Sequence, residues 1–221
     1  MRGGGRLVGR EAFFDGWAKL HGGYDPRSNP LVRWWLTGAY VVARPLARAH
    51  VAPDLVTLLG VVVSAGAVGL AYGGAGWWYA AAALVVVLSG LVDNLDGAVA
   101  VLSGRATRWG HVLDSLADRV SDLLYLVALW AAGAPLAVCA SGGALMFLQE
   151  YARARAAAGG MTEIGVVTVW ERPTRVIVTA AFLASAAVLD DPWPTLGAWA
   201  WVGLGVVGLG QLLVVVRRRL R

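Results

Sequence analysis

A series of apolar stretches, each long or nearly long enough to cross a lipid bilayer, constrains this chain more than any other feature. A transmembrane helix needs about 20 predominantly apolar residues to span the hydrocarbon core. Of the 221 residues, 58% are hydrophobic and 15% are charged, whereas roughly a quarter are charged in soluble domains. The sequence therefore predicts an all-α integral membrane protein. We expect six transmembrane helices, at Leu55–Tyr72, Trp77–Leu95, Trp109–Ala132, Pro135–Tyr151, Arg175–Leu189 and Leu196–Val216.

A segment of mixed character precedes the first apolar stretch. Pro30–His50 combines Trp, Leu and Val with three arginines, which is typical of an amphipathic helix lying in the membrane interface. Pro45 predicts a break in that helix. We accordingly divide the chain into a cytoplasmic N-terminal region with the interfacial helix (1–53), a six-span domain (54–216) and a basic cytoplasmic tail (217–221).

The basic residues orient the predicted helices. They are 18 arginines and one lysine, and the net charge is +5. The connections Gly73–Gly76, Ala132–Ala134 and Asp190–Thr195 contain neither Lys nor Arg. Of the 19 basic residues, 18 lie in or beside the other connections and the two ends, and Arg119 lies inside the third predicted helix. The positive-inside rule then predicts a multi-pass membrane protein with both termini in the cytoplasm. The Arg- and Ala-rich, Lys-poor composition suggests a bacterium of high genomic GC content, so we expect a bacterial plasma membrane. Cations distributed in this way favour membrane lipids as partners and not nucleic acid.

Four aspartates interrupt this apolar chain in two pairs. Asp93 and Asp96 are three residues apart, and Asp114 and Asp118 are four apart, so each pair falls on one face of a helix. The second predicted helix ends on the side where the third begins, so the two pairs lie at similar depth. Uncompensated carboxylates repel one another and are costly at membrane depth. Two divalent cations would neutralise all four, and oxygen ligands favour Mg²⁺, Mn²⁺ or Ca²⁺.

Two glycines accompany the aspartates. Gly97 follows Asp96 directly and Gly110 lies one helical turn before Asp114, so a ligand could approach the backbone at both positions. Asp122 could extend the same face or pair with Arg119, and we leave it outside the site. The alternative interpretation of the aspartates is a water-filled vestibule or a proton relay.

The spacing of these residues resembles the CDP-alcohol phosphotransferase pattern D-x2-D-G-x2-A-R-x8-G-x3-D-x3-D. Seven of its eight fixed positions agree; the departure is Val101, where the family has Arg beside the nucleotide diphosphate. The stretches "APDLVTLLG", "EYARARAAAGG" and "ERPTR" are similar to the actinobacterial phosphatidylinositol phosphate synthases of this family. The resemblance extends over roughly Leu36 to Val216.

The resemblance implies a phosphatidyltransferase of phospholipid biosynthesis. The family moves a phosphatidyl group from CDP-diacylglycerol to the hydroxyl of a polar alcohol, such as inositol phosphate, and releases CMP. It implies two Mg²⁺ or Mn²⁺ ions held by Asp93, Asp96, Asp114 and Asp118, with Asp118 also the general base. The nucleotide contacts that it implies are at Asp93, Gly97, Gly110, Asp114 and Thr57.

The resemblance to the inositol phosphate enzymes of the family implies that five arginines bind the phosphate of the acceptor. They are Arg119, Arg153, Arg155, Arg172 and Arg175. A guanidinium presents a planar fork of donors that suits a phosphate, although these arginines could instead set topology and touch lipid phosphates. The resemblance also implies a homodimer.

Several alternatives stay open at this point. Glycerol 3-phosphate is the main rival acceptor, and Val101 raises the possibility of a weakened, non-catalytic paralogue. A prenyltransferase of the aspartate-rich membrane type is disfavoured by the spacing from Gly97 to Asp118. A transporter is disfavoured because the aspartates gather near one face of the membrane.

Overall fold

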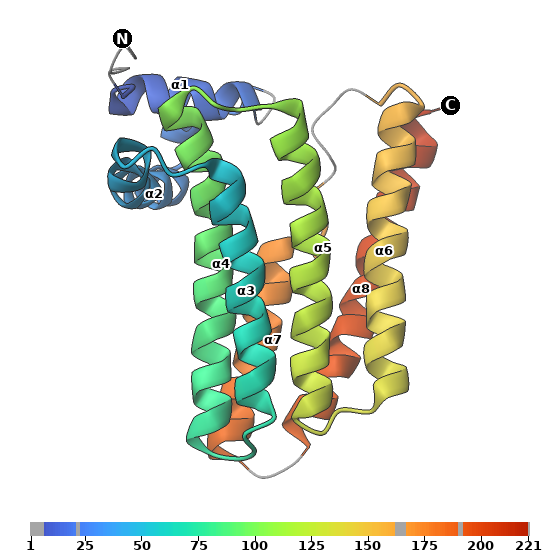
Figure 1. The fold of residues 1–221 in the computed structure, drawn as a ribbon. Helices are drawn as coiled ribbons and strands as arrows, with labels where there is room; N and C mark the ends of the chain where they lie inside the picture. Colours follow the sequence, from blue (N-terminus) through green and yellow to red (C-terminus); the bar gives the residue numbers. More distant parts are fainter. Residues whose placement is uncertain (1–6, 21–22, 162–166, 190–191, 221) are drawn as a thin grey trace. The chain divides into compact units, whose positions relative to one another are not determined.

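The structure is a computed structural model, and it describes residues 7–20, 23–161, 167–189 and 192–220. Within those ranges it contains eight α-helices, one short 3₁₀-helix and no strand, so the all-α fold class is confirmed. Figure 1 shows their order along the chain. The helices are α1 (Arg10–Leu20), η1 (Pro26–Ser28), α2 (Pro30–Arg48), α3 (Pro53–Ala71), α4 (Trp77–Ser103), α5 (Arg108–Ala131), α6 (Leu136–Ala158), α7 (Arg172–Val188) and α8 (Trp193–Arg219).

Three helices of the described chain, α3, α4 and α8, are long and apolar enough to cross a membrane. The other three helices at predicted spans are less apolar or shorter: α5 and α6 carry charged side chains within their length, and α7 has 17 residues. Each of the six predicted stretches coincides with a helix. That α5, α6 and α7 also span the bilayer stays a prediction.

The chain forms two compact units, to which α3, α4 and α5 each contribute residues. Unit 1 consists of the described residues up to Gly60 together with Leu91–Ala117. Apolar side chains of α1, α2 and the C-terminal part of α4 form its core, since α2 places one residue per turn against its neighbours. They are Phe13, Phe14, Leu36, Ala39, Ala43, Ala47, Ala98, Val99 and Leu102.

Two features of unit 1 differ from the sequence predictions. Helix α1 was not predicted, although it places Phe13 and Phe14 in the core cluster and packs Trp17 against it. The predicted break at Pro45 is wrong, because α2 continues to Arg48. The proline removes one N–H donor from the helix, but its carbonyl still accepts the amide of Ala49 at 2.9 Å.

A glycine turn joins the two helices that carry the aspartates. Gly104 follows α4 with a φ of 64°, a left-handed conformation that favours glycine. The amide of Arg105 reaches back to the carbonyl of Ala100 at 2.9 Å, which closes the end of α4. Three residues later α5 begins, and Thr107 accepts the amide of Gly110 at 2.9 Å as its N-terminal cap.

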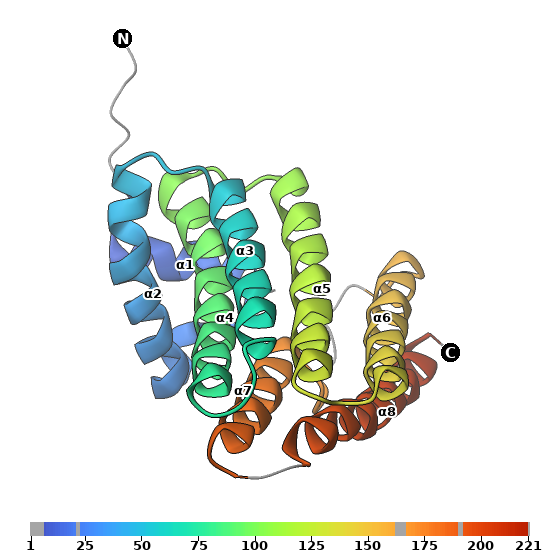
Figure 2. The same cartoon turned by 60° about the horizontal axis from the view of Figure 1, so that its bottom comes forward.

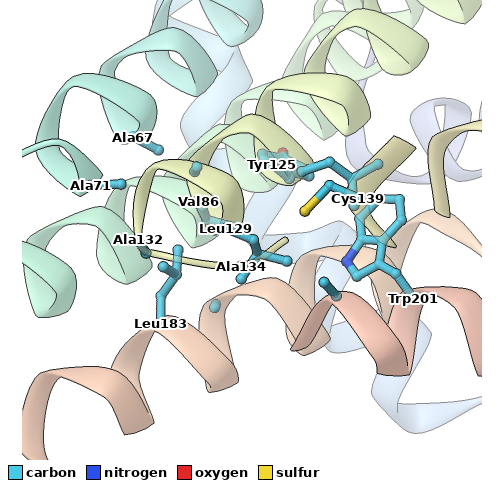
Figure 3. Packing of buried hydrophobic residues seen from close by; sticks show 14 of the residues in the cluster. Ala67, Ala71, Val86, Tyr125, Leu129, Ala132, Ala134, Cys139, Leu183 and Trp201 are labelled. Atoms are coloured by element: carbon cyan, nitrogen blue, oxygen red, sulfur yellow. The ribbon is translucent and has the colours of Figure 1, made fainter. Parts of the chain in front are cut away.

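Unit 2 consists of Val61–Gly90 and the described residues from Asp118 onwards. Within it α8 packs against both α6 and α7, as Figure 2 shows. Small residues permit the close approach of α6 and α8: a Cβ at Gly142 would lie 3.2 Å from the Cβ of Trp201. The buried side chains around Tyr125, Leu129, Leu183 and Trp201 form the apolar core in Figure 3.

Candidate active site

Two of the predicted metal ligands come together in unit 1. Asp93 lies on α4 and Asp114 on α5, and both are half-buried. A carboxylate oxygen of Asp93 lies within 4.8 Å of a carboxylate oxygen of Asp114. Asp118 follows one turn after Asp114 on the same helix, where the four-residue spacing predicts it. An all-oxygen donor set of this kind fits a hard divalent cation.

Asp96 has different surroundings. Its side chain is 7% exposed and accepts the hydroxyl of Thr57 on α3 and the amide of Gly97. Thr57, which was predicted to contact the nucleotide, therefore lies against one of the predicted metal ligands. Gly97 is exposed, and a Cβ there would meet nothing within 4 Å.

Gly110 lies in the first turn of α5, close to the start of α3. A Cβ at this position would come within 3.2 Å of the Thr107 hydroxyl and 3.7 Å of Asp54 Oδ1. The glycine thus allows the N-terminal cap of α5 to pack closely against Asp54. That Gly110 also lets a ligand approach the backbone stays a prediction.

Val101 occupies an apolar environment in unit 1. It packs against the core cluster formed with α1. The packing is tight, since a Cβ on Gly16 of α1 would lie 2.7 Å from Val101 Cγ1. Of the two arginines in the following connection, Arg105 donates to the carbonyl of His50 at 3.3 Å, and Arg108 is exposed.

We expect Val101→Arg to destabilise the protein by about 1–3 kcal/mol, because overpacking and a charge would disturb the contact with Gly16. Thermal unfolding in detergent measures the effect. Ala106→Arg adds the same charge at an exposed site in the nearby connection and should stay within about 0.5 kcal/mol of the wild type. A more active Val101→Arg variant of unchanged stability would contradict this expectation and support the weakened-paralogue interpretation.

In unit 2, arginines surround Asp118. The Arg172 Nε lies 3.0 Å from Asp118 Oδ1, and another nitrogen of the same guanidinium donates to the Asp118 carbonyl at 2.8 Å. Arg119 donates to Asp118 Oδ2 at 3.2 Å. Asp118 is therefore held from two sides by residues predicted to bind the acceptor phosphate.

Asp122 is fully buried among the same arginines. It is 0% exposed and accepts a hydrogen bond of 2.6 Å from Arg175, which is 1% exposed. Arg119 and Arg172 also lie within 3.7 and 3.6 Å of its carboxylate oxygens. Pairing with Arg119 was the alternative considered from the sequence, and the structure supports it. Asp122 thus compensates charge inside this unit.

Two glutamates that sequence reasoning did not single out complete the cluster. Glu150 on α6 lies 3.1 Å from Arg119 and 3.0 Å from Arg175. Glu171, just before α7, pairs with Arg153 at 2.8 Å. Burial opposes ionisation of Glu171, but hydrogen bonds from the Thr168 amide and from Arg153 prevail and lower its pKa below the ordinary value.

Four of the five predicted acceptor arginines take part in this cluster. The fifth, Arg155, is exposed on α6 and lies outside it. Sequence spacing could have indicated this, because residues two apart on a helix point to different sides. The cluster formed by the four arginines with Asp118, Asp122, Glu150 and Glu171 is called the arginine–carboxylate cluster below.

Membrane-length apolar helices and carboxylates gathered from two helices define an all-α, membrane-type protein with an acidic site. The family model of the CDP-alcohol phosphatidyltransferases matches residues 50–210. The chain belongs to this family and is a transferase.

Characterised relatives and solved structures agree with this assignment. The chain is 36% identical over 186 residues to the phosphatidylinositol phosphate synthase of Mycobacterium tuberculosis, covering 80% of this chain and 82% of the relative. The crystal structure of the M. tuberculosis enzyme with CDP-DAG bound is similar with a TM-score of 0.68 and 31% identity, covering 80% and 92% of the two chains. A second structure, with manganese and citrate, has the same TM-score at 32% identity and covers 80% and 88%.

Proposed function

We propose that this protein is a phosphatidylinositol phosphate synthase, which transfers the phosphatidyl group of CDP-diacylglycerol to inositol phosphate and releases CMP. The observation that carries the proposal is the aspartate motif, whose Asp93 and Asp114 bring carboxylate oxygens from two helices within 4.8 Å. The substrate assignment is supported by the similarity of this chain to phosphatidylinositol phosphate synthases, one of which has been solved with CDP-DAG bound.

The membrane setting follows from the same proposal. We infer six transmembrane helices, α3 to α8, preceded by α2 as an interfacial helix, in a bacterial plasma membrane with both termini cytoplasmic. The segments 1–53, 54–216 and 217–221 keep their proposed roles as N-terminal region, catalytic domain and tail. We further propose that the protein acts as a homodimer among membrane lipids.

Asp93, Asp96, Asp114 and Asp118 would hold two Mg²⁺ or Mn²⁺ ions. Their carboxylate oxygens suit either ion, and a related structure contains manganese. When bound, the ions supply positive charge that stabilises a diphosphate and its leaving group. Gly97, Gly110 and Thr57 would line the nucleotide side.

Asp118 is the proposed general base. The acceptor hydroxyl oxygen forms a bond to the phosphorus of the phosphatidyl group, and the bond from that phosphorus to the oxygen of CMP breaks. Asp118 takes the hydroxyl proton as this occurs. Arg119, Arg153, Arg172 and Arg175 would bind the phosphate of the acceptor, and exposed Arg155 could attract it from solution.

The test is CMP release by the purified protein with CDP-diacylglycerol, Mg²⁺ or Mn²⁺ and a panel of acceptors. We expect turnover with inositol phosphate and at least about tenfold lower kcat/KM with unphosphorylated inositol, which lacks the charge that the arginines bind. A preference for glycerol 3-phosphate would reassign the acceptor. Absence of CMP release with every acceptor would indicate the non-catalytic paralogue and refute the proposal.

A further inference from the structure

Glu150 holds several of the proposed acceptor-binding arginines together. Its Oε1 lies 3.0 Å from a nitrogen of Arg175, and its Oε2 lies 3.1 Å from a nitrogen of Arg119. The Nε of Arg153 lies 3.9 Å from the same Oε2. One carboxylate on α6 thus lies among three guanidiniums that come from α5, α6 and α7.

This arrangement has the chemistry of a phosphate site that already contains an anion. Guanidinium groups converging on one acidic group are the usual protein ligands of a phosphate, because each can donate two parallel hydrogen bonds. The Glu150 side chain is 22% exposed, so solvent reaches it. Asp122 also contacts three arginines but is 0% exposed, so a soluble anion cannot readily replace it.

Glu171 belongs to the same arginine–carboxylate cluster but is held differently from Glu150. Its side chain is exposed to a similar extent, 25%, but it accepts the amide and the hydroxyl of Thr168 in addition to Arg153. Thr168 is in turn fixed by Gln149 on α6, which donates to its hydroxyl at 3.1 Å. Glu171 is therefore anchored by the backbone, whereas each contact described above for Glu150 is with a guanidinium.

Charge balance supports exchange at Glu150. The arginine–carboxylate cluster contains four arginines and four carboxylates, so its formal charge is zero. A phosphate monoester adds about 1.5 to 2 negative charges near neutral pH. The negative charge near the four guanidiniums rises least when a carboxylate moves away from them as the phosphate arrives.

The geometry points to Glu150 as a specificity-determining residue: its carboxylate occupies the position of the acceptor phosphate and competes with it for Arg119 and Arg175. The inference rests on the proposed function, in which these arginines bind that phosphate. Competition of this kind sets the acceptor affinity, because only a multiply charged group displaces the carboxylate efficiently. An unphosphorylated polyol has no charge with which to do so.

The test compares the full-length wild type with Glu150→Gln, which keeps the size of the side chain and removes its charge. Binding of inorganic phosphate to the detergent-solubilised protein is measured by calorimetry, without turnover. We expect the Kd of Glu150→Gln for phosphate to fall about five- to tenfold, and KM for the phosphorylated acceptor to fall by a larger factor than kcat changes. Glu171→Gln is the matched control, because it removes one charge from the same cluster; we expect a change of about twofold or less.

The outcomes separate this inference from the proposed function. Equal or weaker phosphate binding by Glu150→Gln would overturn the inference, because Glu150 would then only hold the arginines in place. Tighter phosphate binding without CMP release in either protein would refute the proposed function and leave the competition intact. If Glu150→Gln does not fold, Glu150→Ser also removes the carboxylate, and we expect the same tightening; its absence overturns the inference.

Discussion

Asp118→Asn is expected to lower the rate of CMP release by about 10³-fold or more. An amide cannot take a proton from the acceptor hydroxyl, and general base catalysis alone contributes roughly 10²–10⁴-fold. The substitution also removes a negative charge one turn from Asp114, where the bound cations would lie. Both effects act on the chemical step, so kcat should fall far more than KM for CDP-diacylglycerol rises.

Controls must separate chemistry from folding, because Asp118 also pairs with Arg172 and Arg119. Thermal unfolding of the variant should accompany the rate measurement. Asp15→Asn is a suitable comparison, since Asp15 is an exposed acid of α1 that pairs with Arg27; we expect wild-type rates. An Asp118→Asn protein as active as the wild type would exclude Asp118 as the base.

Helix positions and the aspartate spacing could be predicted because both depend on local periodicity. Apolar runs indicated the helices from α3 to α8, and intervals of three and four residues indicated which carboxylates share a face. The C-terminal extension of α4 to Ser103 was missed because its polar residues interrupt the apolar run. Helix α1 was missed because it is short and contains Gly16, which weakens helix propensity.

The partners of the arginines could not be predicted, because they depend on contacts between distant parts of the chain. Arg119 pairs with Glu150, which is 31 residues away in the sequence, and Arg175 pairs with Asp122, which is 53 residues away. Spacing assigns residues to a helix face but not the neighbour that the face meets. The resemblance to a family indicated the arginines as a set, and only the structure showed that carboxylates balance their charge.

Arg175→Met should destabilise the protein by about 3–5 kcal/mol, because it breaks a buried ion pair from one side. Arg175 is 1% exposed, and its strongest partner, Asp122, is 0% exposed. The guanidinium also donates to the carbonyl of Trp170 at 3.1 Å, so that acceptor loses a partner as well. Unfolding by heat or denaturant in detergent micelles measures the change.

A second substitution shows whether the loss comes from uncompensated charge. Adding Asp122→Asn to Arg175→Met removes the carboxylate left without its shortest ion pair and should recover part of the stability. Arg217→Met, at the exposed end of α8, should change stability by less than about 0.5 kcal/mol. If Arg175→Met were equally mild, Asp122 would be compensated by Arg119 and Arg172 at 3.7 and 3.6 Å. In that case Arg175 would be retained for binding the acceptor and not for holding the fold.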